Sequence, residues 1–457
     1  MWLKPKLQTL KSMSKQIRLS DHFTYGKLLR FTVPSMGMMI FTSIYSVVDG
    51  LFVSNFAGKT PFAALNLIFP FLMFLGIVGF MFGTGGSALI AKTMGEGKPL
   101  TANRIFSMLV CVGFLAGVLF AAVGWPLLDN ISRLLGADEA MVGDCVMYGR
   151  ILLIALPFFI LQIMFQSLLV TAEKPRLGLR ITLLSGVLNM LLDVLLIGIF
   201  HFGLKGAAWA TAISQMCGAI VPLIYFLSPN TSRLHFVRFK FDWAALRQTC
   251  FNGMSEFFSN VSNTVVSMLY NYQLMKYIGE DGVAAYGIIM YLAFVFVAIM
   301  IGYSMGSAPI VSFHYGADNR EELKNVFGKS MKLIAVIGLS QFVLAQILAQ
   351  PLAQIFAGYD PGLHDLTCRA LRIYSVSFLL MGLNGYTSAF FTALNNGVVS
   401  AVLSTYRTLV CETSAVLLLP AIFGVNGIWY AIIFAETAAL ILTVIMLLKH
   451  RKRYGYA

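Results

Sequence analysis

The sequence predicts an all-α membrane protein in which twelve transmembrane helices form two pseudo-symmetric six-helix lobes. Of its 457 residues, 58% are hydrophobic and 12% are charged, and the mean hydropathy is +0.78. Soluble domains carry about 25% charged residues, so a water-soluble core protein is excluded. Apolar runs long enough to cross ~30 Å of hydrocarbon as helices recur along the chain. The same pattern of small residues also returns at a fixed offset of 221 residues.

The apolar runs are divided evenly between the two halves of the chain. In the first half we expect spans near 31–53, 62–84, 105–128, 147–170, 178–200 and 207–227. In the second half we expect spans near 249–276, 283–307, 329–350, 370–393, 398–420 and 427–448. An even number of spans per half makes both halves enter the membrane in the same direction, so the repeat is parallel.

The repeat itself is visible in small residues. Under the 221-residue offset, Gly85 and Gly95 fall on Gly306 and Gly316, and the sequences around them stay in register. Internally repeated membrane folds are common among secondary transporters, whose sites form where the repeats meet. The repeat therefore favours a transporter over a globular enzyme.

Polar segments divide the chain into a basic arm at 1–30, a first lobe at 31–227, a linker at 228–248, a second lobe at 249–448 and a basic tail at 449–457. The arm lacks an apolar h-region, so it is not expected to be a cleavable signal peptide. With a cytoplasmic N-terminus, 25 Lys and Arg residues lie on the cytoplasmic side and seven on the other. This asymmetry predicts that both termini are cytoplasmic, in a plasma membrane of the bacterial inner-membrane type.

No pattern of catalytic residues is present. The six cysteines are scattered without a C-x-x-C pair, and the sequence has no H-E-x-x-H motif, Walker loop or dinucleotide fingerprint. We therefore expect neither an enzyme nor a resident cofactor, so an ion gradient would have to supply any energy. The net charge of +13 is explained by membrane topology and contact with anionic lipids, without nucleic acid.

Carboxylates inside the spans are the main candidates for function. Asp49, Asp193, Glu256, Glu412 and Glu436 lie within apolar runs. An ionised side chain at the centre of a bilayer costs several kcal/mol, so each must face the protein interior, a partner or water.

Four polar residues of the first lobe are predicted to converge. Asp49, Asn189, Asp193 and Thr211 lie within one or two helical turns of the same depth, and Asn189 and Asp193 share a helix face. Their oxygen atoms suit a hard cation such as Na⁺, and two carboxylates in a dry site could equally carry a proton. A structural polar cluster capped by water is the third possibility.

The other buried charges have two interpretations each. Arg407 and Glu436 both lie near the midplane and can form a structural ion pair, with a coupling role as the alternative. Glu256 is about seven residues from the cytoplasmic end of its span. It can extend to the interface, or it can offer a negative charge to a cationic substrate.

Further candidates come from aromatic residues and proline. Tyr270, Tyr286 and Met290 are candidates for an adaptable apolar wall between the lobes. Pro34 stands inside the first span, where it can fix a packing kink or act as a hinge in the helix that carries Asp49.

Several long motifs resemble the multidrug and toxic compound extrusion (MATE) family over about residues 25 to 448. The resemblance rests on the segments Pro34 to Gly58, Leu188 to Asp193, Gly203 to Thr211, Gly282 to Gly287 and Gly306 to Ala317. It implies a two-lobe antiporter that exports small organic compounds, cationic and lipophilic in many cases, by alternating between inward-open and outward-open states. A monomer is expected.

The resemblance also implies a cation site for Na⁺ or H⁺ at Asp49, Asn189, Asp193 and Thr211, with the carbonyl of Ala207 as a further ligand and a helix bend at Pro34. The second lobe departs from the family pattern, because its tenth span has no carboxylate. The roles of Glu256 and Glu412 stay unassigned. A flippase for lipid-linked oligosaccharides and an uncoupled channel or receptor are the alternative functions.

The 221-residue offset places the four site residues on Tyr270, Val410, Ser414 and Ile432. These side chains cannot reproduce a carboxylate site. The sequence therefore predicts that the scaffold is duplicated but that the cation site is confined to the first lobe.

Overall fold

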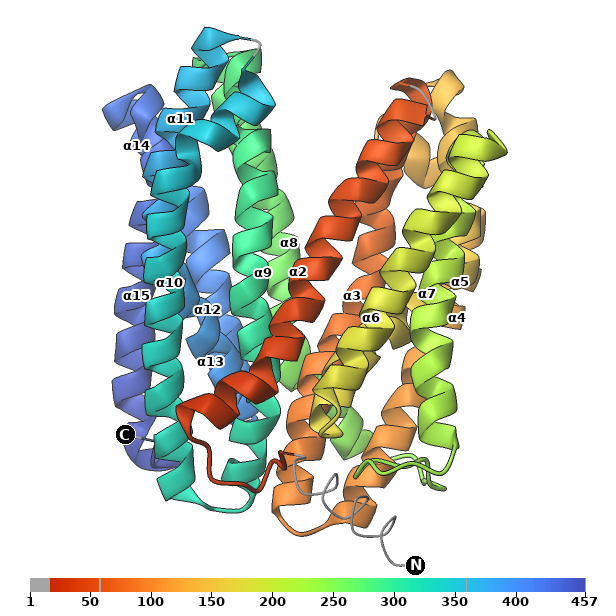
Figure 1. Cartoon of the computed structure of the whole chain (residues 1–457), viewed down its shortest axis with the longest axis vertical. Coiled ribbons are helices and arrows are strands. Elements are labelled where there is room, and N and C mark those ends of the chain that lie inside the picture. Colours follow the sequence, from red (N-terminus) through yellow and green to blue (C-terminus); the bar gives the residue numbers. More distant parts are fainter. Residues whose placement is uncertain (1–16, 57–58, 359, 457) are drawn as a thin grey trace, which may run out of the picture.

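The protein folds into two helical bundles that stand side by side (Figure 1). The structure is a computed structural model that describes residues 17–56, 59–358 and 360–456. Within these residues all regular secondary structure is helical. The first bundle contains α2 (Tyr25–Phe56), α3 (Lys59–Gly95), α4 (Pro99–Leu134), α5 (Glu139–Thr171), α6 (Pro175–Asp193), the π-helix η1 (Val194–Ile199) and α7 (Gly203–Leu227).

The second bundle follows the same plan with more interruptions. It contains α8 (Trp243–Tyr277), α9 (Glu280–Gly316), α10 (Arg320–Ala357), α11 (Pro361–Ser375), α12 (Phe378–Ala393), α13 (Gly397–Thr405), the π-helix η2 (Tyr406–Glu412), α14 (Thr413–Phe423) and α15 (Val425–Tyr454). Adding 221 to the bounds of α3 gives 280 and 316, which are the bounds of α9. The offset found in the sequence thus relates the helices of the two bundles, and the predicted fold class is confirmed.

The helices are long and apolar enough to cross a membrane. Among the described residues, ten helical segments pass this test of length and composition, and α11 with α12 forms an eleventh that is bent by 47°. α8 takes the place of the expected span 249–276 but is more polar, because it carries Asn252, Glu256 and Asn260. The chain is therefore an integral membrane protein.

Helix bounds differ from the predicted segment bounds at three places. α2 begins at Tyr25, inside the predicted arm; α8 begins at Trp243, inside the predicted linker; and α15 continues to Tyr454, inside the predicted tail. These helices continue beyond their apolar runs into polar and basic residues. Basic side chains at a helix end can reach water with their charged groups while their aliphatic parts pack along the helix. Residues 1–16 of the predicted arm lie outside the described part of the chain.

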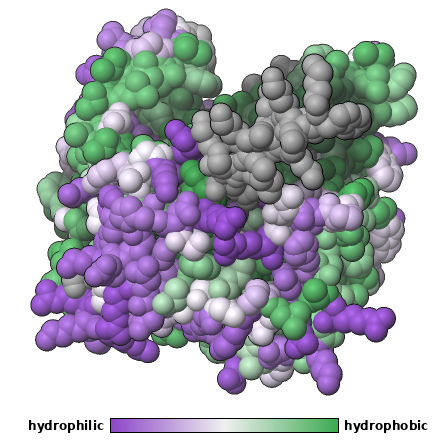
Figure 2. All heavy atoms as spheres, turned by 60° about the horizontal axis from the view of Figure 1, so that its bottom comes forward, coloured by the Kyte–Doolittle hydropathy of each residue, from purple (hydrophilic) through white to green (hydrophobic). Residues whose placement is uncertain are grey.

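The surface agrees with a membrane setting. Large apolar side chains are exposed in the middle of long helices, among them Leu115, Leu339 and Ile441. Figure 2 shows hydrophilic residues gathered on the face that carries the termini and hydrophobic residues along the sides. The Lys and Arg asymmetry of the sequence predicts that this face is the cytoplasmic one.

Glycines allow the two bundles to touch backbone to backbone. A Cβ at Gly95 in α3 would collide with the carbonyl oxygen of Phe313 in α9, and a Cβ at Gly316 in α9 would collide with the carbonyl oxygen of Lys92 in α3. These two contacts are copies of each other, because 92 + 221 is 313 and 95 + 221 is 316. The crossing of α3 and α9 thus lies on the pseudo-symmetry axis.

Two more crossings join the lobes backbone to backbone. A Cβ at Gly253 in α8 would collide with the carbonyl oxygen of Met81 in α3, and one at Gly302 in α9 would collide with the backbone of α2 at Ser35 and Met36. From these crossings the bundles diverge toward the end opposite the termini (Figure 1).

Candidate functional site

The four predicted site residues of the first lobe come together from three helices. Asp49 lies in the last part of α2, Asn189 and Asp193 in the last turns of α6, and Thr211 in α7. The carboxyl group of Asp49 lies within interaction range of the side chains of Asp193 and Asn189. Asn189 and Asp193 are 2% and 0% exposed, so the cluster is shielded from bulk solvent.

The backbone changes geometry next to Asp193. α6 ends at this residue, and the π-helix η1 (Val194–Ile199) follows without a break. π-Helical turns are rare and occur frequently at functional sites, because the wider turn loosens the regular i to i−4 hydrogen bonds. The second lobe repeats this feature in η2, which contains Arg407 and Glu412.

The cluster leaves polar atoms without partners. Asp49 Oδ1, both carboxylate oxygens of Asp193, Asn189 Nδ2 and Thr211 Oγ1 are buried and make no hydrogen bond with another described residue. A buried polar atom without a partner costs about 1–3 kcal/mol, and more if it is charged. Four of these atoms are oxygens, three of them on two carboxylates within range of each other, and such a set fits a small hard cation or a proton.

The structure adds one residue that the sequence analysis missed. Tyr148 of α5 is 2% exposed and lies within interaction range of Asp49, Asp193 and Thr211. Its hydroxyl group brings a further oxygen into the neighbourhood of the cluster from a fourth helix. The only sequence signal was a tyrosine at the start of an apolar run, which is common in membrane helices.

Ala207 lies in α7 and Pro34 lies in α2. Ala207 is buried in α7, one turn before Thr211, so its carbonyl oxygen points along the helix toward Thr211. That oxygen retains a second lone pair beyond the helical hydrogen bond. α2 runs as one continuous helix across Pro34, near the crossing with α9.

Arg407 and Glu436 form a buried ion pair in the second lobe. Arg407 Nη2 and Nε lie 2.6 and 2.7 Å from Glu436 Oε1. Asn384 Nδ2 donates to Glu436 Oε2 at 2.7 Å and to the Glu436 carbonyl oxygen at 2.9 Å. Both carboxylate oxygens are therefore occupied, which is what a buried pair requires to be stable.

Glu412 belongs to the same buried group. It ends η2 five residues after Arg407 and interacts electrostatically with Glu436 and Arg407. Tyr270, which the offset pairs with Asp49, lies within electrostatic range of Glu412 and Glu436. The second lobe thus holds a charged cluster of its own, built from different residue types.

Tyr270 and Tyr286 pack in an apolar cluster of the second lobe. Their rings stack on each other with centroids 4.8 Å apart, and they are 2% and 6% exposed. Met290 packs against the same apolar cluster. The role of these three residues in an adaptable apolar wall between the lobes stays a prediction.

Glu256 lies at the junction of the two lobes. It is half-buried in α8, one turn after Gly253, the glycine that packs against the backbone of α3. Asn260 Nδ2 donates to its backbone carbonyl, and its carboxylate has no basic partner among the described residues. A carboxyl group without a basic partner is therefore available where the lobes meet.

Two parallel six-helix repeats with a buried oxygen cluster in one of them define the class of a two-lobe membrane transporter. The family model MatE matches residues 34–195 and 257–415. These matches cover more than half of the chain, which therefore belongs to the MATE family. Its members are transporters, not enzymes.

Curated relatives match over nearly the whole length. The multidrug export protein MepA of Staphylococcus haemolyticus (strain JCSC1435) is 24% identical, over 94% of this chain and 94% of the relative. MepA of Staphylococcus aureus (strain MRSA252) is 22% identical, over 93% and 94%. The chain is thus similar to complete exporters and not to a part of them.

Solved structures share the fold. A crystal structure of MATE in complex with MaL6 has a TM-score of 0.90 at 22% identity, covering 97% of this chain and 99% of that one. An outward-facing conformation of a multidrug resistance MATE family transporter also scores 0.90, covering 97% and 98%. A MOP superfamily transporter from Pyrococcus furiosus, described as having a binding pocket of reverse polarity, scores 0.88 over 97% and 98%.

Proposed function

We propose that this protein exports amphipathic organic cations in exchange for Na⁺ or H⁺. The observation that carries the proposal is the set of orphaned polar atoms on Asp49, Asn189, Asp193 and Thr211. Two buried carboxylates held this close are stable only when a cation or a proton reduces their repulsion. The names of the staphylococcal relatives support multidrug export as the activity.

The polarity of the interior supports a cationic substrate. Asp49, Asp193, Glu256 and Glu412 place acidic side chains within the membrane-spanning part of the protein, while Arg407 is already paired with Glu436. A polyanionic lipid-linked substrate would require the opposite sign. The same excess of acidic side chains distinguishes the proposed exporter from the flippase alternative.

We expect ion binding to be coupled to export because the carboxylate cluster of Asp49 and Asp193 lies in the first lobe only. An ion can shift the balance between two conformations only if it binds them with different affinity. Binding at Asp49, Asp193 and Thr211 joins α2, α6 and α7, so it can favour one arrangement of these helices over the other. Proton or Na⁺ binding would then displace the organic cation from the first lobe.

The observed arrangement corresponds to the outward-open state in this proposal. The lobes touch near the termini and diverge at the other end (Figure 1). We assign the end with the termini to the cytoplasm and the protein, acting as a monomer, to the plasma membrane. The fold similarity to an outward-facing transporter supports this assignment.

The test is efflux of a fluorescent organic cation in everted membrane vesicles, with Na⁺ and H⁺ gradients imposed separately. We expect transport into the vesicle lumen under one of the two gradients. Asp49→Asn and Asp193→Asn should each abolish coupled transport, whereas Asp129→Asn, an exposed aspartate of the same lobe, should not. Absence of transport under both gradients would refute the proposal.

A further inference from the structure

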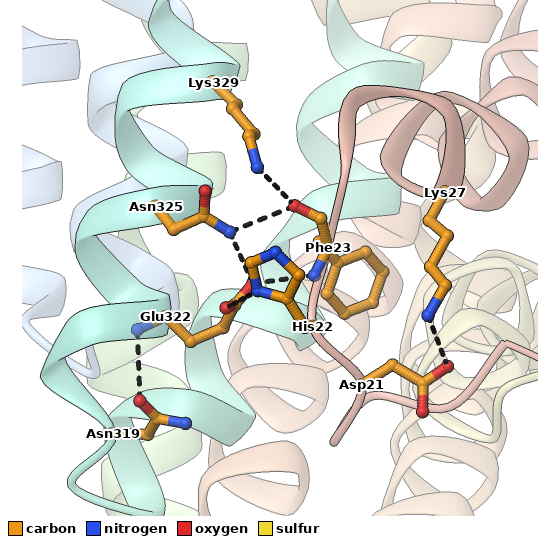
Figure 3. Close-up of polar contacts among 8 residues, drawn as sticks. All are labelled: Asp21, His22, Phe23, Lys27, Asn319, Glu322, Asn325 and Lys329. Atoms are coloured by element: carbon orange, nitrogen blue, oxygen red, sulfur yellow. Dashed lines mark hydrogen bonds and ion pairs between the residues drawn. The ribbon is translucent and has the colours of Figure 1, made fainter.

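The segment before the first helix ties the two lobes together on the side of the termini. Residues 17–24 precede α2, and Figure 3 shows this segment against the start of α10. Leu19 and Phe23 in this strap are both 0% exposed. The strap is therefore packed into the protein.

One end of the strap is held by a carboxylate of the first lobe. The Leu19 backbone N–H donates to Glu173 Oε1 at 2.8 Å. Glu173 lies in the turn between α5 and α6, is 6% exposed, and pairs with Arg233 of the linker at 3.3 Å. Burial raises the pKa of Glu173, against the opposing effects of Leu19 and Arg233.

The other end is held by α10 of the second lobe. The Phe23 N–H donates to Glu322 Oε1 at 2.8 Å, and His22 Nδ1 lies 2.6 Å from Glu322 Oε2 (Figure 3). The Phe23 carbonyl oxygen accepts from Lys329 Nζ at 2.7 Å and from Asn325 Nδ2 at 3.0 Å. The backbone N–H and C=O groups of Phe23 are thus both bound by side chains of α10.

The Phe23 ring adds an apolar anchor at this end. It packs edge-on against Phe31 of α2 and against His314 of α9, with centroid distances of 6.2 and 6.4 Å. His314 is 2% exposed, so the ring closes over the end of α9.

The strap is short. Its two tethered N–H groups are four positions apart in sequence, and an extended chain spans at most about 3.6 Å per residue, so these two nitrogen atoms can be no more than about 14 Å apart while both hold. A turn at residues 19–20 takes up part of this length. When the lobes separate on this side, the start of α2 must leave either Glu322 or Glu173. The two contacts therefore act in series.

We propose that Glu173 and Glu322 are gating residues of the transport cycle, which hold the strap across both lobes and keep the cytoplasmic side closed. This inference rests on the proposed function, in which that side opens once per cycle. The two carboxylates are positioning residues: they touch the strap, not the transported cation.

The experiment measures opening directly, without substrate or ion gradient. Ser35→Cys places a reporter thiol at the α2–α9 crossing, where Ser35 is 0% exposed. A membrane-impermeant maleimide is added to everted vesicles, and the same background without Ser35→Cys corrects for labelling of the six native cysteines. Labelling of the reporter then reports separation of the lobes on the cytoplasmic side.

Loss of either anchor should expose the reporter. Glu173→Gln and Glu322→Gln are each expected to raise the labelling rate about tenfold, because each weakens hydrogen bonds to a charged group. Glu96→Gln and Glu321→Gln are matched controls: both residues lie on the same side without contact to the strap, and neither variant should change the rate. Unchanged rates in both anchor variants would overturn the proposal.

The double variant tests whether the two anchors act as one latch, that is, as a single connection between the lobes, or as two independent local contacts. Because the anchors act in series, Glu173→Gln/Glu322→Gln should label no faster than the faster single variant. A rate equal to the product of the two single effects would overturn the series arrangement. Lys329→Met, which weakens the Phe23 contact but keeps both carboxylates, should raise the rate about threefold and covers the case in which Glu322→Gln fails to fold.

Failure of this inference is distinguishable from failure of the proposed function. If export is absent under both gradients but the labelling rates change as expected, the antiporter is refuted and the latch stands. If export is present and the labelling rates do not change, the latch is refuted alone.

Discussion

The carbonyl oxygen of Phe313 in α9 occupies the space that a side chain at Gly95 in α3 would need. The pseudo-symmetric contact places the carbonyl oxygen of Lys92 against Gly316. Because both partners are backbone atoms in long helices, neither can move aside without shifting a whole helix. The closed side of the protein therefore depends on glycine at these two positions.

Gly95→Ala should weaken closure on the side of the termini. The added methyl group forces α3 and α9 apart, so we expect the labelling of Ser35→Cys from the cytoplasmic side to rise severalfold. Gly328→Ala in α10 is the matched control, since no atom lies within 4 Å of a Cβ there. If Gly95→Ala labels at the rate of Gly328→Ala, the backbone contact does not limit opening.

Tyr148→Phe should weaken ion coupling without preventing insertion. The change removes one hydroxyl group beside Asp49, Asp193 and Thr211 and keeps the ring that fills the space. We expect the concentration of coupling ion needed for half-maximal export to rise severalfold, because one polar group near the two carboxylates is lost. The measurement is export as a function of Na⁺ or H⁺ concentration in vesicles.

Tyr303→Phe provides the control for that prediction. Tyr303 is equally buried, but its hydroxyl group donates to Ser330 in the second lobe at 2.8 Å, far from the carboxylate cluster. Its ion dependence should match that of the unmodified protein. A shift of the same size in both variants would mean that Tyr148 acts through packing alone.

Much of the fold could be predicted because its signals are local or periodic. The apolar runs fix the helices, and the constant offset fixes their pairing: the bounds of α3 plus 221 are the bounds of α9. The depth of each residue in the membrane was enough to predict that Asp49 lies near Asn189 and Asp193. In a straight helix of known direction, the sequence position of a residue gives its height.

Other features depend on contacts between distant segments and leave no such signal. Leu19 binds Glu173 through its backbone N–H, which every residue except proline carries, so side-chain identity does not reveal the contact. Tyr270 and Tyr286 stack inside the second lobe because the rotation of α8 and α9 turns both inward, and rotation is set by packing between helices. For the same reason, the sequence did not reveal that Tyr148 lies near the carboxylate cluster.

Arg407→Met should destabilise the protein far more than loss of an exposed ion pair. Glu436 is 1% exposed and would keep a buried charge with only Asn384 as partner. Breaking a buried pair costs about 3–5 kcal/mol, whereas an exposed pair such as Arg133 with Asp129 contributes about 0–1 kcal/mol. Thermal unfolding of purified protein in detergent should show a clear drop in midpoint for Arg407→Met and little change for Arg133→Met.

The double variant Arg407→Met/Glu436→Gln tests the physical reason. Replacing both charged partners removes the uncompensated charge, so a large part of the lost stability should return. A double variant as unstable as Arg407→Met alone would show that packing of the guanidinium group, not pairing of the charge, supports the second lobe.

Glu256→Gln should discriminate between substrates by charge. The carboxylate lies at the junction of the lobes without a basic partner among the described residues, so a passing organic cation gains a favourable interaction there that a neutral compound does not. At an effective dielectric constant near 20, one charge pair at about 4 Å is worth ~4 kcal/mol before desolvation, so even a partly exposed site can alter affinity severalfold. We expect the KM for a cationic probe to rise at least threefold, while the KM for a neutral probe of similar size stays unchanged.

Glu280→Gln, which changes an exposed glutamate at the start of α9, is the matched control and should leave both values as they are. An equal rise for cationic and neutral probes would assign Glu256 to the packing of the α3–α8 crossing instead.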